Sequence, residues 1–157
     1  MKSKKLSEKI LRSIKSMGFS NITLDPVLET KYILQRSGEN FKKFLFSFYD
    51  LNGKELCLRP DLTISSVIRF IQNKKDSREK VFYSGEAFRK TYQKKDSIIK
   101  NQIGYEILGS KNKQKDDKEI IDTSLKVLKK SGFKKSILKI GNVELFNLLI
   151  DKLDIPR

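Results

Sequence analysis

The sequence reads KVFYSGEAFRKTY at residues 80–92 and NQIGYEILG at residues 101–109, and these two stretches decide the fold. Both are rich in the aromatic and β-branched residues that are typical of strands. The first stretch is interrupted by Ser84-Gly85, which predicts two strands there, and the second predicts one strand that ends at Gly109. The predicted strands cover residues 80–83, 86–92 and 101–108.

Upstream, residues 44–58 predict a β-hairpin that leads into a helix. An aromatic strand is followed by a turn around Asn52-Gly53 and by a returning strand. Pro60 ends the returning strand, and Asp61 or Thr63 can cap the helix that follows. The apolar face of this helix consists of Leu62, Ile64, Val67, Ile68 and Ile71.

The rest of the chain is assigned from hydrophobic spacing and from turn residues. Helices are predicted over residues 4–17, 27–35 and 143–153, and another is built on Ile120, Ile121, Leu125 and Leu128 and stopped by Gly132. Residues 21–24 are predicted to be extended, 73–79 and 110–118 to be polar links, and 136–140 to be a strand. Because several strands pair with their sequence neighbours, we predict an α+β fold in which helices flank an antiparallel sheet.

The composition excludes several kinds of chemistry. With no histidine, the sequence cannot hold a catalytic Ser/His/Asp or Cys/His pair or a histidine-ligated metal. Cys57 is the only cysteine, so an intramolecular disulfide and a multi-cysteine zinc site are excluded as well. We expect no metal, no cofactor and a cytoplasmic location. The sequence has neither an apolar signal-peptide core nor a run of about 18 apolar residues, so we expect no membrane association.

The net charge of +15 raises the question of a nucleic-acid partner, because clustered cations bind a phosphate backbone. Only seven of the 34 basic residues are arginine, the residue best suited to bidentate recognition of phosphate and guanine. The lysines are also spread along the whole chain. We therefore interpret the excess as a solvated surface and do not expect a nucleic-acid partner.

Two groups of polar residues are candidates for a ligand site. Asp61 and Thr63 follow the end of a strand, where a carboxylate and a hydroxyl can hold an ammonium group or can simply cap the helix. In an extended strand Gln102, Gly104 and Glu106 share one face, and Gly104 would leave room between the two polar groups for a ligand. The alternative is a solvated polar face opposite an apolar one.

Arg89 lies on the neighbouring predicted strand. Its guanidinium could reach the same face of the sheet and pair there with a ligand carboxylate or phosphate. The opposite face of the later strand is predicted to be apolar, because it carries Ile103, Tyr105 and Ile107.

These residues occur in motifs that resemble class II aminoacyl-tRNA synthetases. DPVLE at residues 25–29 resembles their proline-containing first motif, and YSGEAFR at residues 83–89 resembles the opening of their second motif. The order of these motifs with residues 58–63, 102–109 and 117–121 is similar to that in histidyl-tRNA synthetases and in a non-synthetase paralogue. That paralogue is the regulatory subunit of ATP phosphoribosyltransferase, which acts in the first step of histidine biosynthesis.

Details within the motifs favour the regulatory family. Asp61-Leu62-Thr63 resembles its pattern, whereas synthetases usually read Glu-Gly-Thr there. Thr91 stands where a synthetase would place a glutamate, and residues 94–99 lack the expected Gly-Arg and Arg-Glu pairs. The resemblance thus implies a non-catalytic subunit that assembles with a short-form ATP phosphoribosyltransferase catalytic subunit, as a homodimer within a hetero-oligomer. The alternative is an N-terminal fragment of a histidyl-tRNA synthetase.

The resemblance also implies a site and a domain. The histidine-contacting positions of the family correspond to Asp61, Leu62, Thr63, Arg89, Gln102 and Glu106, with no catalytic residue. The carboxylates would hold the ammonium or imidazole group of L-histidine, and the arginine would hold its carboxylate. Residues 1–157 would form one domain like the N-terminal half of a class II synthetase catalytic domain, incomplete at its carboxyl end.

Overall fold

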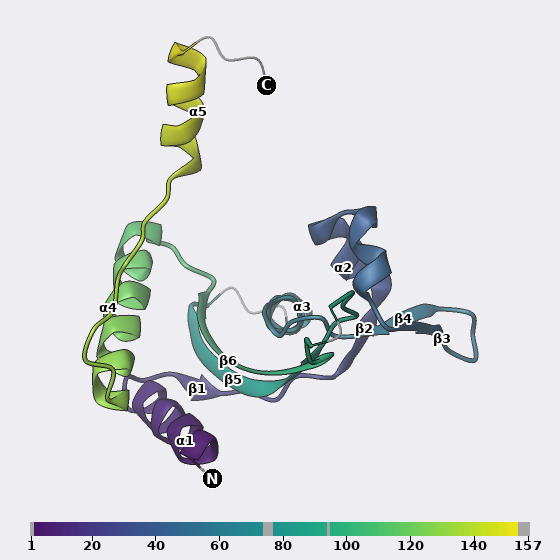
Figure 1. The fold of residues 1–157 in the computed structure, drawn as a ribbon, viewed down its shortest axis with the longest axis horizontal. Coiled ribbons are helices and arrows are strands. Elements are labelled where there is room, and N and C mark those ends of the chain that lie inside the picture. Colours follow the sequence, from purple (N-terminus) through teal and green to yellow (C-terminus); the bar gives the residue numbers. More distant parts are fainter. Residues whose placement is uncertain (1, 74–76, 94, 154–157) are drawn as a thin grey trace.

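The structure is a computed structural model that describes residues 2–73, 77–93 and 95–153. Its strands form two three-stranded sheets (Figure 1). In chain order the elements are α1 (Lys2–Lys15), β1 (Ser20–Asn21), β2 (Val27–Glu29), α2 (Thr30–Ser37), the 3-10 helix η1 (Glu39–Phe44), β3 (Ser47–Tyr49), β4 (Glu55–Leu58), α3 (Thr63–Gln72), β5 (Glu79–Phe88), β6 (Ile99–Leu108), α4 (Lys113–Ser131) and α5 (Val143–Lys152).

The larger sheet has the strand order β1-β5-β6, so that β6 is an edge strand. The antiparallel pairing of β5 with β6 runs from Glu79 opposite Leu108 to Phe88 opposite Ile99, and the short β1 is parallel to β5. The predicted break at Ser84-Gly85 is wrong, because both residues pair with β6 within one continuous strand. The predicted end of the later strand before Gly109 is confirmed.

The smaller sheet has the order β2-β4-β3 and contains the predicted hairpin. Asp50 closes the hairpin turn, since its Oδ1 accepts hydrogen bonds from the backbone N–H groups of Asn52 and Lys54 at 2.8 and 2.9 Å. Gly53 adopts a positive φ of 76° in this turn. The helix predicted from residue 27 is wrong in its first turn, because Val27–Glu29 is β2 and pairs with β4.

The two faces of the larger sheet carry different layers. Buried Ile14, Phe19, Phe82 and Val127 form a core between α1, α4 and one face, and the predicted apolar face of β6 packs against it. Figure 1 shows α3 on the inner side of the curved β5–β6 ribbon, with α1 and α4 on its outer side. The predicted ligand-site residues belong to the inner side.

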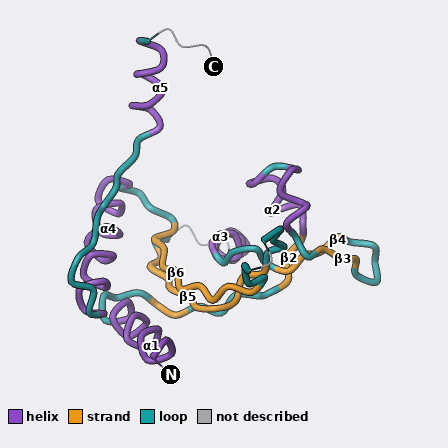
Figure 2. The backbone as a smooth tube through the Cα atoms, in the orientation of Figure 1, coloured by secondary structure: helices purple, strands orange, loops and turns teal. Residues whose placement is uncertain are grey.

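The C-terminal third departs from two sequence predictions. Residues 110–118 were predicted as a link, but α4 already begins at Lys113, where the Asn112 side chain accepts a hydrogen bond from the backbone of Lys115 at 3.1 Å. The strand predicted over 136–140 is also wrong, because this segment is loop (Figure 2) and its Ile137 and Ile140 side chains are exposed. The last helix, α5, is confirmed and extends away from the sheet (Figure 1).

None of the helices in the described ranges is long and apolar enough to cross a membrane.

An ion-pair cluster fixes the start of α4 to β5. The guanidinium of Arg78 donates to both carboxylate oxygens of Asp116 at 2.7 to 3.1 Å and also pairs with Glu119. Lys80 reaches Glu119 at 2.6 Å. The hydrogen bonds from Arg78 lower the pKa of Asp116, and Lys80, followed by Arg78, lowers the pKa of Glu119. The cluster accounts for a helix in a stretch whose polarity predicts a loop.

Replacing Asp116 by asparagine is expected to lower stability at neutral pH, with a loss that shrinks in acid. Because the pKa of Asp116 is lowered in the folded state, its contribution is complete above the unfolded-state pKa and disappears as the pH falls through the folded value. Urea unfolding of both proteins near pH 7 and near pH 3 measures this. Asp117→Asn, at an exposed neighbouring position, is the control. A deficit of the same size at both pH values would contradict the ion-pair explanation.

Candidate functional site

The junction between β4 and α3 is fixed by a buried arginine. Arg59 is 8% exposed, and its guanidinium donates from Nε to the carbonyl of Glu86 at 2.8 Å and from Nη1 to the carbonyl of Leu24 at 2.5 Å. Its backbone N–H donates to Pro26, and its carbonyl accepts from Phe88. Burial lowers the pKa of this guanidinium. Arg59 thereby ties together three segments around the candidate site.

Asp61 and Arg89 lie next to each other at this junction, and Arg89 follows the end of β5 at Phe88 instead of lying within the strand predicted over residues 86–92. Oδ1 of Asp61 accepts from the backbone of Ile64 at 3.1 Å, so the predicted capping interaction is present. Its Oδ2 lies 3.8 Å from Nη2 of Arg89, and Nε of Arg89 donates to the carbonyl of Pro60 at 2.8 Å. The Arg89 side chain is 44% exposed. A guanidinium that is both held in place and exposed can bind a ligand carboxylate.

A second polar group crosses the inner face of the sheet. The hydroxyl of Tyr83 donates to Oε1 of Glu106 at 2.5 Å and lies 3.2 Å from Oγ1 of Thr63. Since the phenol proton points to Glu106, the Thr63 hydroxyl is the donor in the second contact. Burial, followed by the bond to Glu106, raises the pKa of Tyr83, so this hydroxyl stays protonated. The other carboxylate oxygen of Glu106 is buried and has no partner in the described chain.

The expected space above Gly104 is not free. Tyr83 is directly opposite Gly104 in the strand pairing, and its ring lies where a methyl group at position 104 would be. The expectation that Gly104 makes room for a ligand is therefore wrong, because the glycine makes room for Tyr83. Sequence reasoning assigned no role to Tyr83 or Arg59. A signal for Arg59 was its charge directly after the apolar run Leu56-Cys57-Leu58.

The remaining two predicted residues lie in different surroundings. Leu62 is 1% exposed and packs in a core cluster with Leu24, Tyr83 and Ala87, so its side chain supports the site from below. Gln102 pairs across the sheet with Gly85 and is half-buried. It stands on the same strand face as Glu106, as the alternation predicts.

The arrangement brings together charged groups of both signs. It offers carboxylate acceptors at Asp61 and Glu106 and a guanidinium donor at Arg89, which are complementary to the charged groups of a free amino acid. In the described ranges, no group of three carboxylate or thiol side chains could hold a metal.

Comparisons with known proteins find histidyl-tRNA synthetases and proteins related to them. A family model described as "Histidyl-tRNA synthetase" matches residues 1–157. An ATP phosphoribosyltransferase regulatory subunit of Lactococcus lactis is 30% identical over 77% of this chain and 37% of its own length. A histidine–tRNA ligase of Methanococcus vannielii is 32% identical over 98% of this chain and 41% of its own length. The chain thus spans about two fifths of these relatives.

A solved structure supports the fold. It is described as an ATP phosphoribosyltransferase regulatory subunit/histidyl-tRNA synthetase from Bacillus halodurans and superposes with a TM-score of 0.79 at 23% identity. The match covers 94% of this chain and 39% of that one. The predicted resemblance to a class II synthetase fold, with sheets flanked by helices, is confirmed.

Proposed function

Because the chain belongs to the histidyl-tRNA synthetase family, we propose that it acts as a non-catalytic regulatory subunit of ATP phosphoribosyltransferase, in the first step of L-histidine biosynthesis. Relatives that carry the name of this subunit, from Lactococcus lactis and Caldanaerobacter subterraneus, are 30% and 27% identical to it. The partner would be a short-form catalytic subunit, joined to a homodimer of this chain in the cytoplasm. No residue of this chain is assigned a catalytic role, and no cofactor is required.

The observation that carries the proposal is that Asp61 lies beside Arg89, whereas the residues that follow Arg89 lack the glutamate and the arginine-containing pairs of the synthetase pattern. Thr91 stands where the synthetase pattern has a glutamate, and its Oγ1 accepts from the backbone of Gln93 at 3.1 Å. That bond closes a local turn. The groups that a synthetase would use for ATP and for the acceptor strand are thus replaced, whereas the groups that fit an amino acid are kept.

Histidine is the proposed ligand of the site. Its carboxylate would pair with Arg89, its ammonium group with Asp61, and an imidazole N–H with the unpartnered oxygen of Glu106. Binding can regulate the catalytic subunit only if histidine favours one state of the assembly over another. Gln102 and Thr63 would complete the polar lining, and Leu62 would hold it from the core side.

Mixing the purified chain with a short-form catalytic subunit tests this function. We expect the two to co-elute in size-exclusion chromatography, and the turnover of the catalytic subunit and its inhibition by histidine to change. Bovine serum albumin at the same concentration controls for nonspecific stabilisation. Separate elution together with unchanged turnover and unchanged inhibition would contradict the proposal for this chain.

A second candidate is the front part of a histidyl-tRNA synthetase. It is favoured by the family match over residues 1–157 and by the 32% identity to the Methanococcus vannielii ligase. Histidine-dependent exchange between ATP and pyrophosphate separates the two candidates. A synthetase catalyses this exchange, whereas we expect none from the proposed regulatory subunit.

A further inference from the structure

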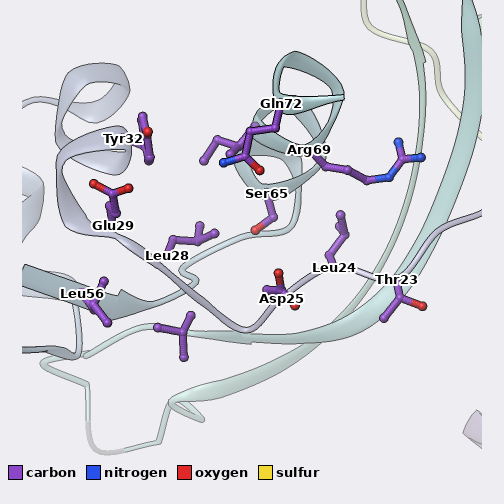
Figure 3. A pocket seen from close by; sticks show the side chains of 12 residues that line it. Thr23, Leu24, Asp25, Leu28, Glu29, Tyr32, Leu56, Ser65, Arg69 and Gln72 are labelled. Atoms are coloured by element: carbon purple, nitrogen blue, oxygen red, sulfur yellow. The ribbon is translucent and has the colours of Figure 1, made fainter. Parts of the chain in front are cut away.

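A hollow of about 350 Å³ lies between α3, the small sheet and the segment that joins β1 to β2 (Figure 3). None of the six residues of the predicted histidine site lines it. Its walls combine apolar side chains, Leu24, Leu28 and Leu56 among them, with polar groups from residues 23–29 and from α3. A volume of this size lies at the lower end of the range of small-ligand sites.

One lining residue, Ser65, has a buried hydroxyl group without a hydrogen-bond partner in the described chain. Ser65 is 4% exposed. Two other helical serines, Ser13 and Ser124, donate to the carbonyl four residues earlier at 2.9 and 2.7 Å. Figure 3 shows the Ser65 hydroxyl pointing into the hollow instead. A buried hydroxyl without a partner costs free energy, which a bound donor or acceptor would recover.

Of the two carboxylates in the lining, one is already paired with lysines and the other is not. The carboxylate of Asp25, an exposed residue, faces the side of Ser65 in Figure 3 and forms no hydrogen bond or ion pair within the described ranges. The carboxylate of Glu29 is already held by Lys31 at 2.6 Å and Lys54 at 2.8 Å. Asp25 also attracts the buried Arg59, whose positive charge partly offsets the negative charge of the carboxylate.

Arg69, the basic residue in the lining, does not neutralise Asp25. Its Nη1 lies 3.1 Å from Glu79 on β5, and Figure 3 shows its guanidinium directed away from the hollow. The amide of Gln72 points back toward Ser65 in the same view. The free groups are therefore a carboxylate, a hydroxyl and an amide above an apolar floor.

We propose that this hollow binds a small alkylammonium ligand. The ammonium group would donate hydrogen bonds to the Asp25 carboxylate and the Ser65 hydroxyl, and the alkyl chain would pack on Leu24 and Leu28. Charge-assisted hydrogen bonds are stronger than neutral ones, so the ammonium group distinguishes this ligand from an alcohol of the same size. This site does not depend on the proposed regulatory function.

Titration with n-butylammonium chloride, followed by amide chemical shifts in NMR spectra, tests the site. We expect saturable shifts confined to residues 23–29 and 65–72, and at least tenfold weaker binding of n-butanol. Asp25→Asn is expected to weaken amine binding about tenfold or more, while Asp122→Asn on the exposed face of α4 leaves it unchanged. Equal binding of butanol, an unaffected Asp25→Asn variant, or no saturation by about 100 mM amine would overturn the proposal.

A second measurement examines Ser65 without any ligand. Ser65→Ala removes a hydroxyl that lacks a partner, so we expect the Tm of the free protein to stay the same or rise, and the amine to bind more weakly. Ser124→Ala is the matched control, because Ser124 bonds to Ile120 and to Tyr105, and its loss is expected to lower the Tm. A Tm lowered equally by both substitutions would show that Ser65 has a structural partner and would overturn the proposal.

Discussion

An Arg59→Met variant is expected to unfold with a free energy about 3–6 kcal/mol lower than that of the unmodified protein. The guanidinium is buried and donates to the carbonyls of Leu24 and Glu86. Hydrogen bonds from a charged group contribute about 1.5–3 kcal/mol each, and methionine would leave both carbonyls unsatisfied. Urea denaturation followed by circular dichroism gives the free energy of unfolding.

Arg12→Met provides the comparison for Arg59, because it makes the same chemical change at a surface position. Arg12 is 80% exposed, and its ion-pair partner in the described part of the chain is Glu8, at 3.4 Å on the same helix. Such a pair contributes about 0.3–0.5 kcal/mol. If both variants lose the same small amount of stability, Arg59 does not hold the three segments together.

Replacing Glu106 by glutamine is expected to weaken histidine binding by about 10- to 100-fold, if histidine is the ligand as proposed. Glutamine keeps the shape of the side chain and can still accept the hydrogen bond of Tyr83, but it removes the negative charge. It also presents an amide N–H or a neutral carbonyl to the ligand in place of the second carboxylate oxygen. Isothermal titration calorimetry with L-histidine measures the affinity.

Glu86→Gln is the control for this experiment. Glu86 is exposed on the opposite face of the same sheet and is not one of the six predicted site residues, so its substitution changes the net charge equally at a position outside that set. We expect histidine affinity to be unchanged in that variant. An equal loss in both variants would assign the effect to overall charge, and no loss in either would remove Glu106 from the site.

Local signals predicted much of the fold correctly. The turn around Asn52-Gly53, the helix stop at Gly132 and the alternation along β6 depend on neighbouring residues only, and all three are confirmed. The break predicted at Gly85 is wrong because a glycine is needed there to leave space for a residue that is distant in the sequence. A methyl group there would be 2.6 Å from Nη2 of Arg59, so the glycine accommodates that guanidinium within a continuous strand.

The candidate site could be predicted only in part, because some of its features depend on local sequence and others on contacts between distant segments. The proximity of Asp61 to Arg89 follows from two strand ends that meet, and the resemblance to known motifs indicated both residues. The position of the Tyr83 ring over Gly104 depends on the register between β5 and β6, which no single segment of sequence specifies. The start of α4 combines a local signal, the Asn112 cap, with a distant one, the bond from Arg78 to Asp116.

The edge position of β6 has a consequence for how copies of this chain interact. In the described chain its outer edge pairs with no strand, and such an edge can template the addition of a strand from another molecule. A net charge of +15 disfavours such nonspecific edge-to-edge association, because like-charged molecules repel each other at long range. The excess of lysine therefore protects the protein against aggregation through this edge. The protection weakens as salt shortens the screening length from about 10 Å at 0.1 M to about 3 Å at 1 M.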